Sequence, residues 1–133
     1  MNYQGFITAY LSSLIGTEIV YSMNDCHIMA LTVIDIMCDT HYTDEIRGKY
    51  HTPKEGRAYA IKNCSYPTLD ALCVSTGTEV SEPNDGDILI AKDHCTVFWR
   101  GKILVLNNNG IWCVSKINTP EIENYKIYRI RRN

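Results

Sequence analysis

The sequence lacks the features that mark several special classes of protein. No apolar run approaches the ~20 residues that span a bilayer. The chain starts Met1-Asn2-Tyr3-Gln4, without the positive flank and small-residue cleavage site of a signal peptide. It also has no internal repeat, no low-complexity segment and no linker long enough to divide it. We therefore expect no membrane span and no export through the Sec pathway.

An excess of positive charge is also missing. Thirteen Lys and Arg residues stand against fifteen Asp and Glu residues, which gives a net charge of −2 at pH 7. Proteins that hold nucleic acid non-specifically need a basic field, so we expect no nucleic-acid partner. The locally basic tail contains Lys126, Arg129, Arg131 and Arg132. We interpret it as a solvated edge strand guarded against aggregation or, alternatively, as a contact for a phosphate or acidic surface.

The six cysteines include no CxxC pair, which argues against a typical zinc site. Cys26-His27 and Cys38-x-x-His41 are candidate metal ligands. On one helix the two pairs would lie about 18 Å apart, too far for one ion. We expect no metal and no cofactor, and interpret the thiols as reduced and mostly buried. They are Cys26, Cys38, Cys64, Cys73, Cys95 and Cys113.

The first part of the sequence has a helical pattern. Apolar residues from Tyr3 to Leu14 recur at three- and four-residue spacing, and Gly16 is placed to end that helix. The segment from Cys26 to Cys38 is apolar on nearly every side, which is typical of a buried central helix. Asn24 or Asp25 is its expected N-cap.

The next segment, from Cys38 to Tyr50, is polar and is expected to be a loop. A capping box at Thr52 to Glu55, with proline at the first helical position, predicts a third helix over about 53–63. Pro67 is expected to open a fourth, shorter helix that stops at Gly77.

The pattern then changes to short β-rich runs separated by turn residues. This arrangement, helices first and hairpins second, predicts an α+β fold rather than a parallel α/β sheet. We expect one domain over residues 1–133, with a helical half at about 1–80 and a strand half at about 81–133. The predicted strands are Asp87–Lys92, Thr96–Trp99, Lys102–Leu106, Ile111–Val114 and Tyr125–Ile130, and hairpin turns are expected at 100–101 and 107–110.

Cys26 is the cysteine best placed for chemistry. In the first turn of a buried helix, amide dipoles favour the thiolate and lower the pKa, which makes the sulfur a nucleophile. The alternative is that Cys26 is one more thiol of the hydrophobic core.

The segments Tyr21–Cys26 (YSMNDC) and Asp85–Ile90 (DGDILI) resemble the NlpC-type cell-wall peptidases of papain-like fold. The chain is more similar still to small phage-encoded relatives of those peptidases, over about residues 3–130. The likeness includes Arg47–Tyr50 (RGKY) before the third helix and a hairpin that ends near Asn109-Gly110. It implies a papain-like fold with the cysteine helix packed on a small antiparallel sheet.

The resemblance also assigns roles to residues. It makes Cys26 the nucleophile, Asp25 its acidic neighbour and Tyr21 the aromatic residue at the mouth of the site. His94 is then the general base or, alternatively, a polar turn residue. For the third polar residue of the site we consider Asn107, which alternatively begins a hairpin turn.

The sequence departs from the peptidases at two places. The strand that usually supplies the third polar residue is apolar here, over Ile103–Leu106, and the residue after the nucleophile is His27 instead of serine. His27 is a conceivable substitute base, although neighbours on a helix point in directions about 100° apart.

The resemblance implies two functions. The first is a cysteine hydrolase that cleaves an amide bond in peptidoglycan. The alternative is a catalytically degenerate structural or adaptor subunit of a phage tail or virion. The expected partners are accordingly peptidoglycan or virion and tail proteins. We expect the protein to be made in the bacterial host cytoplasm and incorporated into the virion.

Overall fold

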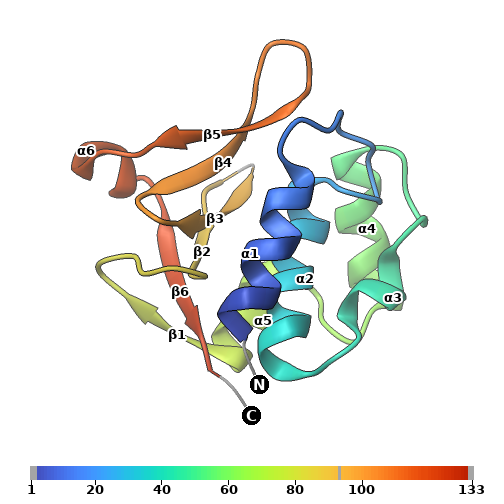
Figure 1. Ribbon diagram of the computed structural model, residues 1–133. Coiled ribbons are helices and arrows are strands. Elements are labelled where there is room, and N and C mark those ends of the chain that lie inside the picture. The colour runs from blue at the N-terminus through green and yellow to red at the C-terminus, as the bar shows by residue number, and fades with distance from the viewer. Residues whose placement is uncertain (1–2, 93, 132–133) are drawn as a thin grey trace.

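The computed structural model describes residues 3–92 and 94–131 and shows an α+β fold in which N-terminal helices pack on a six-stranded antiparallel sheet (Figure 1). The helices are α1 (Tyr3–Leu14), α2 (Cys26–Cys38), α3 (Tyr42–Ile46), α4 (Pro53–Asn63), α5 (Leu69–Thr76) and the short α6 (Thr119–Ile122). The strands are β1 (Gly77–Val80), β2 (Ile88–Ile90), β3 (Cys95–Trp99), β4 (Lys102–Leu106), β5 (Trp112–Lys116) and β6 (Lys126–Ile130).

The sheet has the strand order β1-β6-β2-β3-β4-β5, and neighbouring strands are antiparallel. The last strand therefore lies inside the sheet, with Ile130 opposite Gly77 on one side and Tyr128 opposite Ile88 on the other. The turn between β3 and β4 has positive φ at Arg100 and Gly101, as a tight two-residue hairpin requires.

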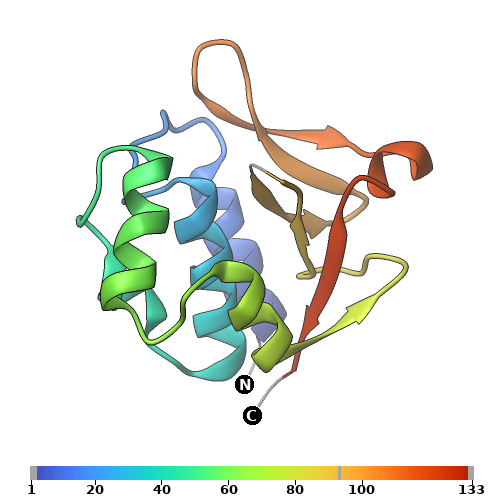
Figure 2. The same cartoon turned by 180° about the vertical axis from the view of Figure 1, so that it is seen from behind.

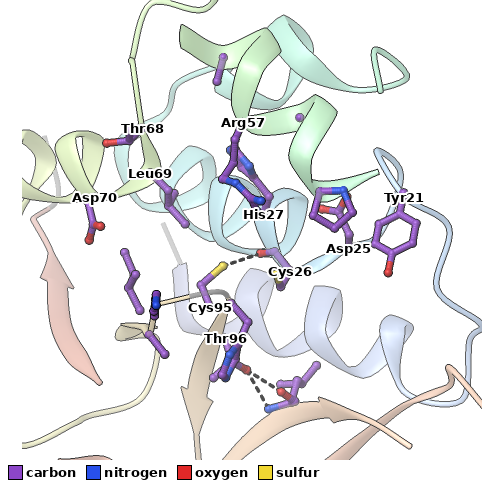
Figure 3. A pocket seen from close by; sticks show the side chains of 18 of the residues that line it. Tyr21, Asp25, Cys26, His27, Arg57, Thr68, Leu69, Asp70, Cys95 and Thr96 are labelled. Carbon is purple, nitrogen blue, oxygen red and sulfur yellow. Dashed lines mark hydrogen bonds between the residues drawn. The ribbon is translucent and has the colours of Figure 1, made fainter. Parts of the chain in front are cut away.

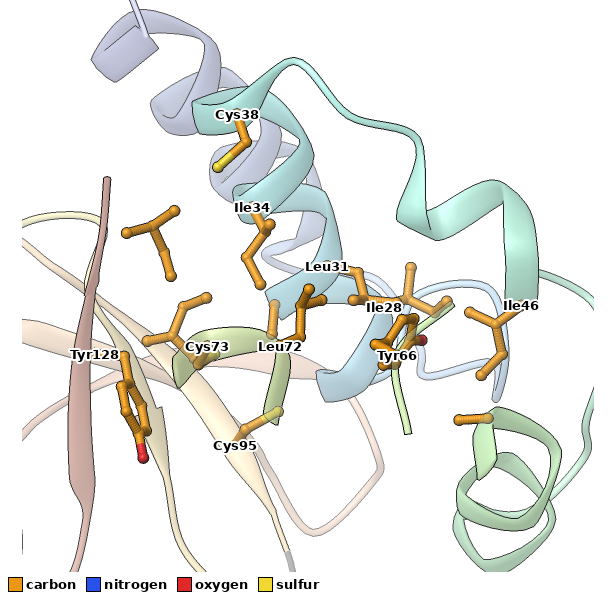
Figure 4. Close-up of a cluster of buried hydrophobic side chains, with 14 of the residues drawn as sticks. Ile28, Leu31, Ile34, Cys38, Ile46, Tyr66, Leu72, Cys73, Cys95 and Tyr128 are labelled. Atoms are coloured by element: carbon orange, nitrogen blue, oxygen red, sulfur yellow. The ribbon is translucent and has the colours of Figure 1, made fainter. Parts of the chain in front are cut away.

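Helix α2 is buried on both sides, as its apolar sequence predicts. One side packs in a cluster with residues of α5 and β6 (Figure 4), and the other packs against α1, β3 and β4. Seen from behind, α2 lies between α1 and α4 (Figure 2). A helix held so completely fixes the position of its first residue, Cys26. The α2 side chains with essentially no exposure are Ile28, Met29, Ala30, Leu31, Val33 and Ile34.

The expectation of a loop from Cys38 to Tyr50 is wrong, because this segment contains α3. The carboxylate of Asp35, on α2, accepts hydrogen bonds from the backbone N–H groups of Tyr42 at 2.8 Å and Thr43 at 3.0 Å. These bonds satisfy amides at the start of α3. A five-residue helix held by a side chain of another helix leaves no periodic signal in its own sequence.

Two further elements were not expected. Strand β1 follows α5 without a break and pairs with β6 alone, and α6 lies in the connection before β6. The fourth helix begins at Leu69 instead of Pro67, because the Thr68 hydroxyl accepts the Ala71 N–H at 3.1 Å and caps the helix there.

The basic tail is not an edge strand, so that interpretation is wrong. Strand β6 is paired on both sides, and the side chain of its arginine, Arg129, binds another residue of the chain. Arg129 donates to the buried carboxylate of Asp87, with Nη2 at 2.9 Å from Oδ2. Arg131 donates to the carbonyl of Gly77 at 2.8 Å. Arg132 lies outside the described residues.

The far end of α2 lies beside the end of β6. The Cys38 thiol donates to the carbonyl oxygen of Arg131 at 3.4 Å. The start of α1 lies at the same end of the molecule in both ribbon views (Figures 1 and 2). Within the described part of the chain, none of the helices has the length and apolar character needed to cross a membrane.

Candidate functional site

A cleft with a volume of about 610 Å³ lies between the start of α2, helix α4 and strands β2 to β4. Five of the six residues expected at the site line it, namely Tyr21, Asp25, Cys26, His27 and His94. Figure 3 shows the first four of these side chains around the start of α2. The sixth, Asn107, is not among the described residues that line the cleft.

Asp25 is the N-cap of α2, and both oxygens of its carboxylate accept hydrogen bonds. One oxygen accepts the N–H of Ile28 at 2.9 Å, and the other accepts the N–H of Ser22 at 2.8 Å. The second oxygen also accepts the buried hydroxyl of Tyr50. The Asp-Cys motif and the RGKY segment therefore meet at one carboxylate, which fixes the helix end that carries Cys26.

The loop before α2 is tied to the sheet. The indole N–H of Trp112, on β5, donates to the carbonyl of Asn24 at 2.8 Å. The side chain of Asn24 accepts the N–H of Val20 at 2.6 Å and donates to the carbonyl of Glu18 at 3.0 Å. These contacts hold the backbone immediately before Cys26 without using a residue of the helix.

A second thiol lies beside Cys26. Cys95, the first residue of β3, donates to the carbonyl oxygen of Cys26 at 3.2 Å (Figure 3). The thiol of Cys95 and the backbone N–H groups of Cys95 and His27 lower the pKa of Cys26 to about 7, against an opposing effect of burial. The thiolate form of Cys26 is therefore favoured relative to that of an ordinary cysteine.

His94 has features of both alternatives considered for it, a turn residue and a side chain of the site. Its carbonyl accepts the N–H of Ala91 at 2.8 Å, as a residue of the β2–β3 turn would. Its side chain nevertheless lines the cleft, and Nε2 lies 2.9 Å from the hydroxyl of Tyr125. The two rings meet edge to face, with centroids 5.5 Å apart. The imidazole is thus held in a defined orientation at the cleft wall.

His27 and Tyr21 occupy different depths of the cleft. Nε2 of His27 lies 3.0 Å from the hydroxyl of Tyr66, and burial lowers the pKa of the imidazole, which favours its neutral form. Tyr21 is 42% exposed and lies at the rim.

Asn107 holds the turn between β4 and β5. Its side-chain oxygen accepts the N–H groups of Asn109 at 2.8 Å and Ile111 at 3.1 Å. This is an Asx-type turn, which asparagine stabilises by mimicking a backbone carbonyl. Asn107 is thus found at the first position of the hairpin turn, which was the alternative considered for it.

Two residues of the site, Cys95 and Tyr125, are not predicted by the sequence. Cys95 was grouped with the core thiols, and it is indeed only 6% exposed. Its position directly after His94 was no signal, because successive residues of a strand point to opposite faces of the sheet. Tyr125 had no local signal, since it reaches His94 from a position 31 residues away. Arg57 and Asp70 add two charges to the lining.

The cysteine-histidine pairs considered as metal ligands do not form a cluster. Cys38 bonds a carbonyl at the opposite end of α2 from Cys26. Within residues 3–92 and 94–131, no group of three or more His, Cys, Asp or Glu side chains is arranged to hold a metal ion.

Comparison with known proteins gives a family for the chain. Residues 1–120 match the family described as "Domain of unknown function (DUF6950)". The chain belongs to this family. No curated protein matched the chain, and no solved structure did. The matched region includes α1 to β5, and therefore Cys26, Cys95 and His94 together, whereas Tyr125 lies beyond it.

Proposed function

We propose that this member of the DUF6950 family is a cysteine hydrolase of the papain-like NlpC type. The carrying observation is the placement of Cys26, whose thiol has a pKa of about 7 and begins a buried helix at the wall of a large cleft. Nucleophilic acyl transfer commonly uses a thiol of lowered pKa, a helix N-terminus and a histidine in the same cleft.

The arrangement of elements supports the papain-like part of the proposal. The cysteine helix is central, antiparallel strands face its N-terminal end, and the cleft runs between the helical and strand halves. The resemblance of the YSMNDC and DGDILI segments to the NlpC-type peptidases points to the same fold. Gly86 and Asp87 of the second segment support the sheet, because the Gly86 N–H donates to the carbonyl of Phe98 at 2.8 Å and the Asp87 carboxylate accepts from Arg129.

In the proposed reaction, the Cys26 thiolate attacks the carbonyl carbon of an amide and forms a tetrahedral intermediate. Amide groups in the first turn of α2 stabilise its oxyanion. His94, which carries the proton taken from the Cys26 thiol, gives it to the departing amine, and the acyl group remains on sulfur as a thioester. Water, deprotonated by His94, attacks this thioester, which releases the acid and regenerates the thiol.

Tyr125 takes the orienting role that Asn107 does not fill. Its hydroxyl holds Nε2 of His94, which leaves Nδ1 as the nitrogen available for proton transfer in the cleft. A base needs such a partner to fix its tautomer and its direction. Tyr125 is therefore a positioning residue in this proposal.

We propose an amide bond of peptidoglycan as the substrate, and the test is lysis of purified bacterial cell walls. Wild-type protein should release soluble fragments, whereas Cys26→Ala should release none. Cys113→Ala is the matched control, because Cys113 is a cysteine of β5 that does not line the cleft. Equal lysis by wild type and Cys26→Ala, with both folded by circular dichroism, would exclude this mechanism.

The second candidate function is a catalytically degenerate structural or adaptor subunit of a phage tail or virion. The observation that favours it is the commitment of the Asn107 side chain to a turn, since the residues of β4 that line the cleft, 103–106, are all apolar. This function predicts that the protein co-purifies with virions and that Cys26→Ser leaves phage infectivity unchanged. Absence of the chain from purified particles would count against it.

Both functions share one proposed location. The protein would be made in the bacterial host cytoplasm and incorporated into the tail of the virion, where peptidoglycan and tail proteins are its available partners.

A further inference from the structure

We propose that Cys26 and Cys95 form a reversible disulfide, and that a low-molecular-weight disulfide such as oxidised glutathione is the oxidant. The inference concerns a modification of the site, and it rests on the proposed function only for its consequence for activity. The geometry that carries it is independent of any substrate.

The two thiols are already neighbours in the reduced protein. Cys95 Sγ lies 3.2 Å from the carbonyl oxygen of Cys26, and each thiol shifts the pKa of the other. Both residues begin regular elements, α2 and β3, whose positions are fixed by core packing. We expect the bond to close by rotation of the two side chains about Cα–Cβ.

The two cysteines differ in access, which assigns them different roles. Cys26 is partly exposed and lines the cleft, whereas Cys95 is 6% exposed. A small disulfide in the cleft can therefore reach Cys26 first. Cys95 is shielded from bulk oxidant and can only resolve what forms on Cys26.

The chemistry balances in two exchanges. The Cys26 thiolate attacks one sulfur of oxidised glutathione, which forms a mixed disulfide and releases one glutathione thiolate. Cys95, after losing its proton to water, attacks the Cys26 sulfur and releases the second glutathione thiolate. Two protein thiols are oxidised by two electrons, and one glutathione disulfide is reduced to two thiols.

The first exchange promotes the second. Hydrogen bonding to Cys26 is the largest cause that raises the pKa of Cys95, because Cys95 keeps its proton in order to donate it. Once Cys26 is capped, its sulfur carries no negative charge and that cause is removed. The pKa of Cys95 then falls, while burial continues to raise it.

The test is peptide mapping of the folded full-length protein after incubation with oxidised glutathione near pH 8. The expected wild-type product is a single intramolecular disulfide that joins the Cys26 and Cys95 peptides and is lost on treatment with dithiothreitol. Cys95→Ser should instead retain one glutathione on Cys26, because the resolving thiol is missing. Cys113→Ser, the matched control, should behave as wild type.

Three outcomes overturn the inference: a stable glutathione adduct on wild-type Cys26, no reaction at Cys26, or a disulfide that joins Cys95 to another cysteine such as Cys73. Wild-type mapping alone decides the matter, so a misfolded variant does not obscure it. Failure of the hydrolase proposal is read separately, as absence of cell-wall lysis by fully reduced protein. If reduced protein is active, the oxidised form should fall to background and recover with dithiothreitol.

Discussion

The thiol of Cys26 is subject to opposing influences. Burial favours the neutral thiol, whereas the Cys95 thiol and two backbone N–H groups favour the thiolate and prevail. His94 is not among the causes of this shift. The pKa of Cys26 is therefore lowered by groups other than His94, the base of the proposed mechanism.

This balance gives a prediction for alkylation of the folded protein by iodoacetamide. The pKa of Cys26 is lowered to about 7, so its alkylation rate should rise as the pH passes upward through about 7. The alkylation rate of a free thiol rises near its pKa of ~8.5. In Cys95→Ala the largest lowering cause is removed, and the midpoint should move toward higher pH. The measurement is the rate of modification of each cysteine by peptide mass spectrometry from about pH 5 to pH 9.

Cys113 serves as the internal reference in the same digest, because it does not line the cleft. A wild-type midpoint at the free-thiol value would contradict the assignment of Cys95 as the group that arms Cys26. An unchanged midpoint in Cys95→Ala would do the same.

At the scale of elements, the N-terminus of α2 is held more firmly than those of the other capped helices. Asp25 supplies the usual cap bond to Ile28 and also accepts the buried hydroxyl of Tyr50. Thr52 caps α4 through one bond, to the N–H of Glu55 at 3.2 Å, and is exposed. The helix that carries the nucleophile thus has a cap connected to the rest of the fold.

Asp25→Ala should therefore destabilise the protein by more than Thr52→Ala. Loss of a cap alone costs about 0.5–2 kcal/mol. Asp25→Ala also leaves a buried tyrosine hydroxyl without its acceptor, which adds about 1–3 kcal/mol. The measurement is urea unfolding of the two variants beside wild type. Equal losses in the two variants would show that the Tyr50 contact contributes nothing.

The sequence predicted the elements whose signals are local. Helices α2 and α4 have the bounds that their caps and periodicity predict, and β4 lies where its apolar run lies. The structure differs from the sequence prediction where an element forms because of a partner far away in the sequence. Helix α3 depends on a carboxylate of α2, and β1 forms because β6 pairs with it.

The candidate site shows the same division. Local pattern placed Cys26 at the start of a helix, and family resemblance directed attention to His94, whose side chain lines the same cleft. Cys95 and Tyr125 became visible only when strands far apart in sequence were brought together. Asn107 could not be resolved from sequence, because asparagine suits both a catalytic network and a turn.

At the scale of the whole molecule, Cys26 and Cys95 join the two halves. Cys26 belongs to the helices and Cys95 to the sheet, 69 residues later in the chain. A bond between them would close a large loop of the unfolded chain and reduce its entropy. The same bond would fix the cleft wall that the two halves share.

The oxidised protein should accordingly be more stable than the reduced protein, by about 2–4 kcal/mol. The measurement is the urea midpoint of protein treated with oxidised glutathione against protein kept in dithiothreitol. Cys113→Ser, treated in the same two ways, should show the same difference, and Cys95→Ser should show none. A lower midpoint for oxidised wild type would mean that the bond strains the packing of α2 on β3.

Helix α2 also sets the distance between the cleft and the ends of the described chain. Its thirteen residues place Cys26 about 18 Å from Cys38, whose thiol bonds Arg131. A tag or carrier protein fused at Tyr3 or Arg131 would therefore leave from the end of the molecule opposite the nucleophile. Immobilised in this way on a solid support, the protein would present its cleft outward to an insoluble polymer such as a cell-wall fragment.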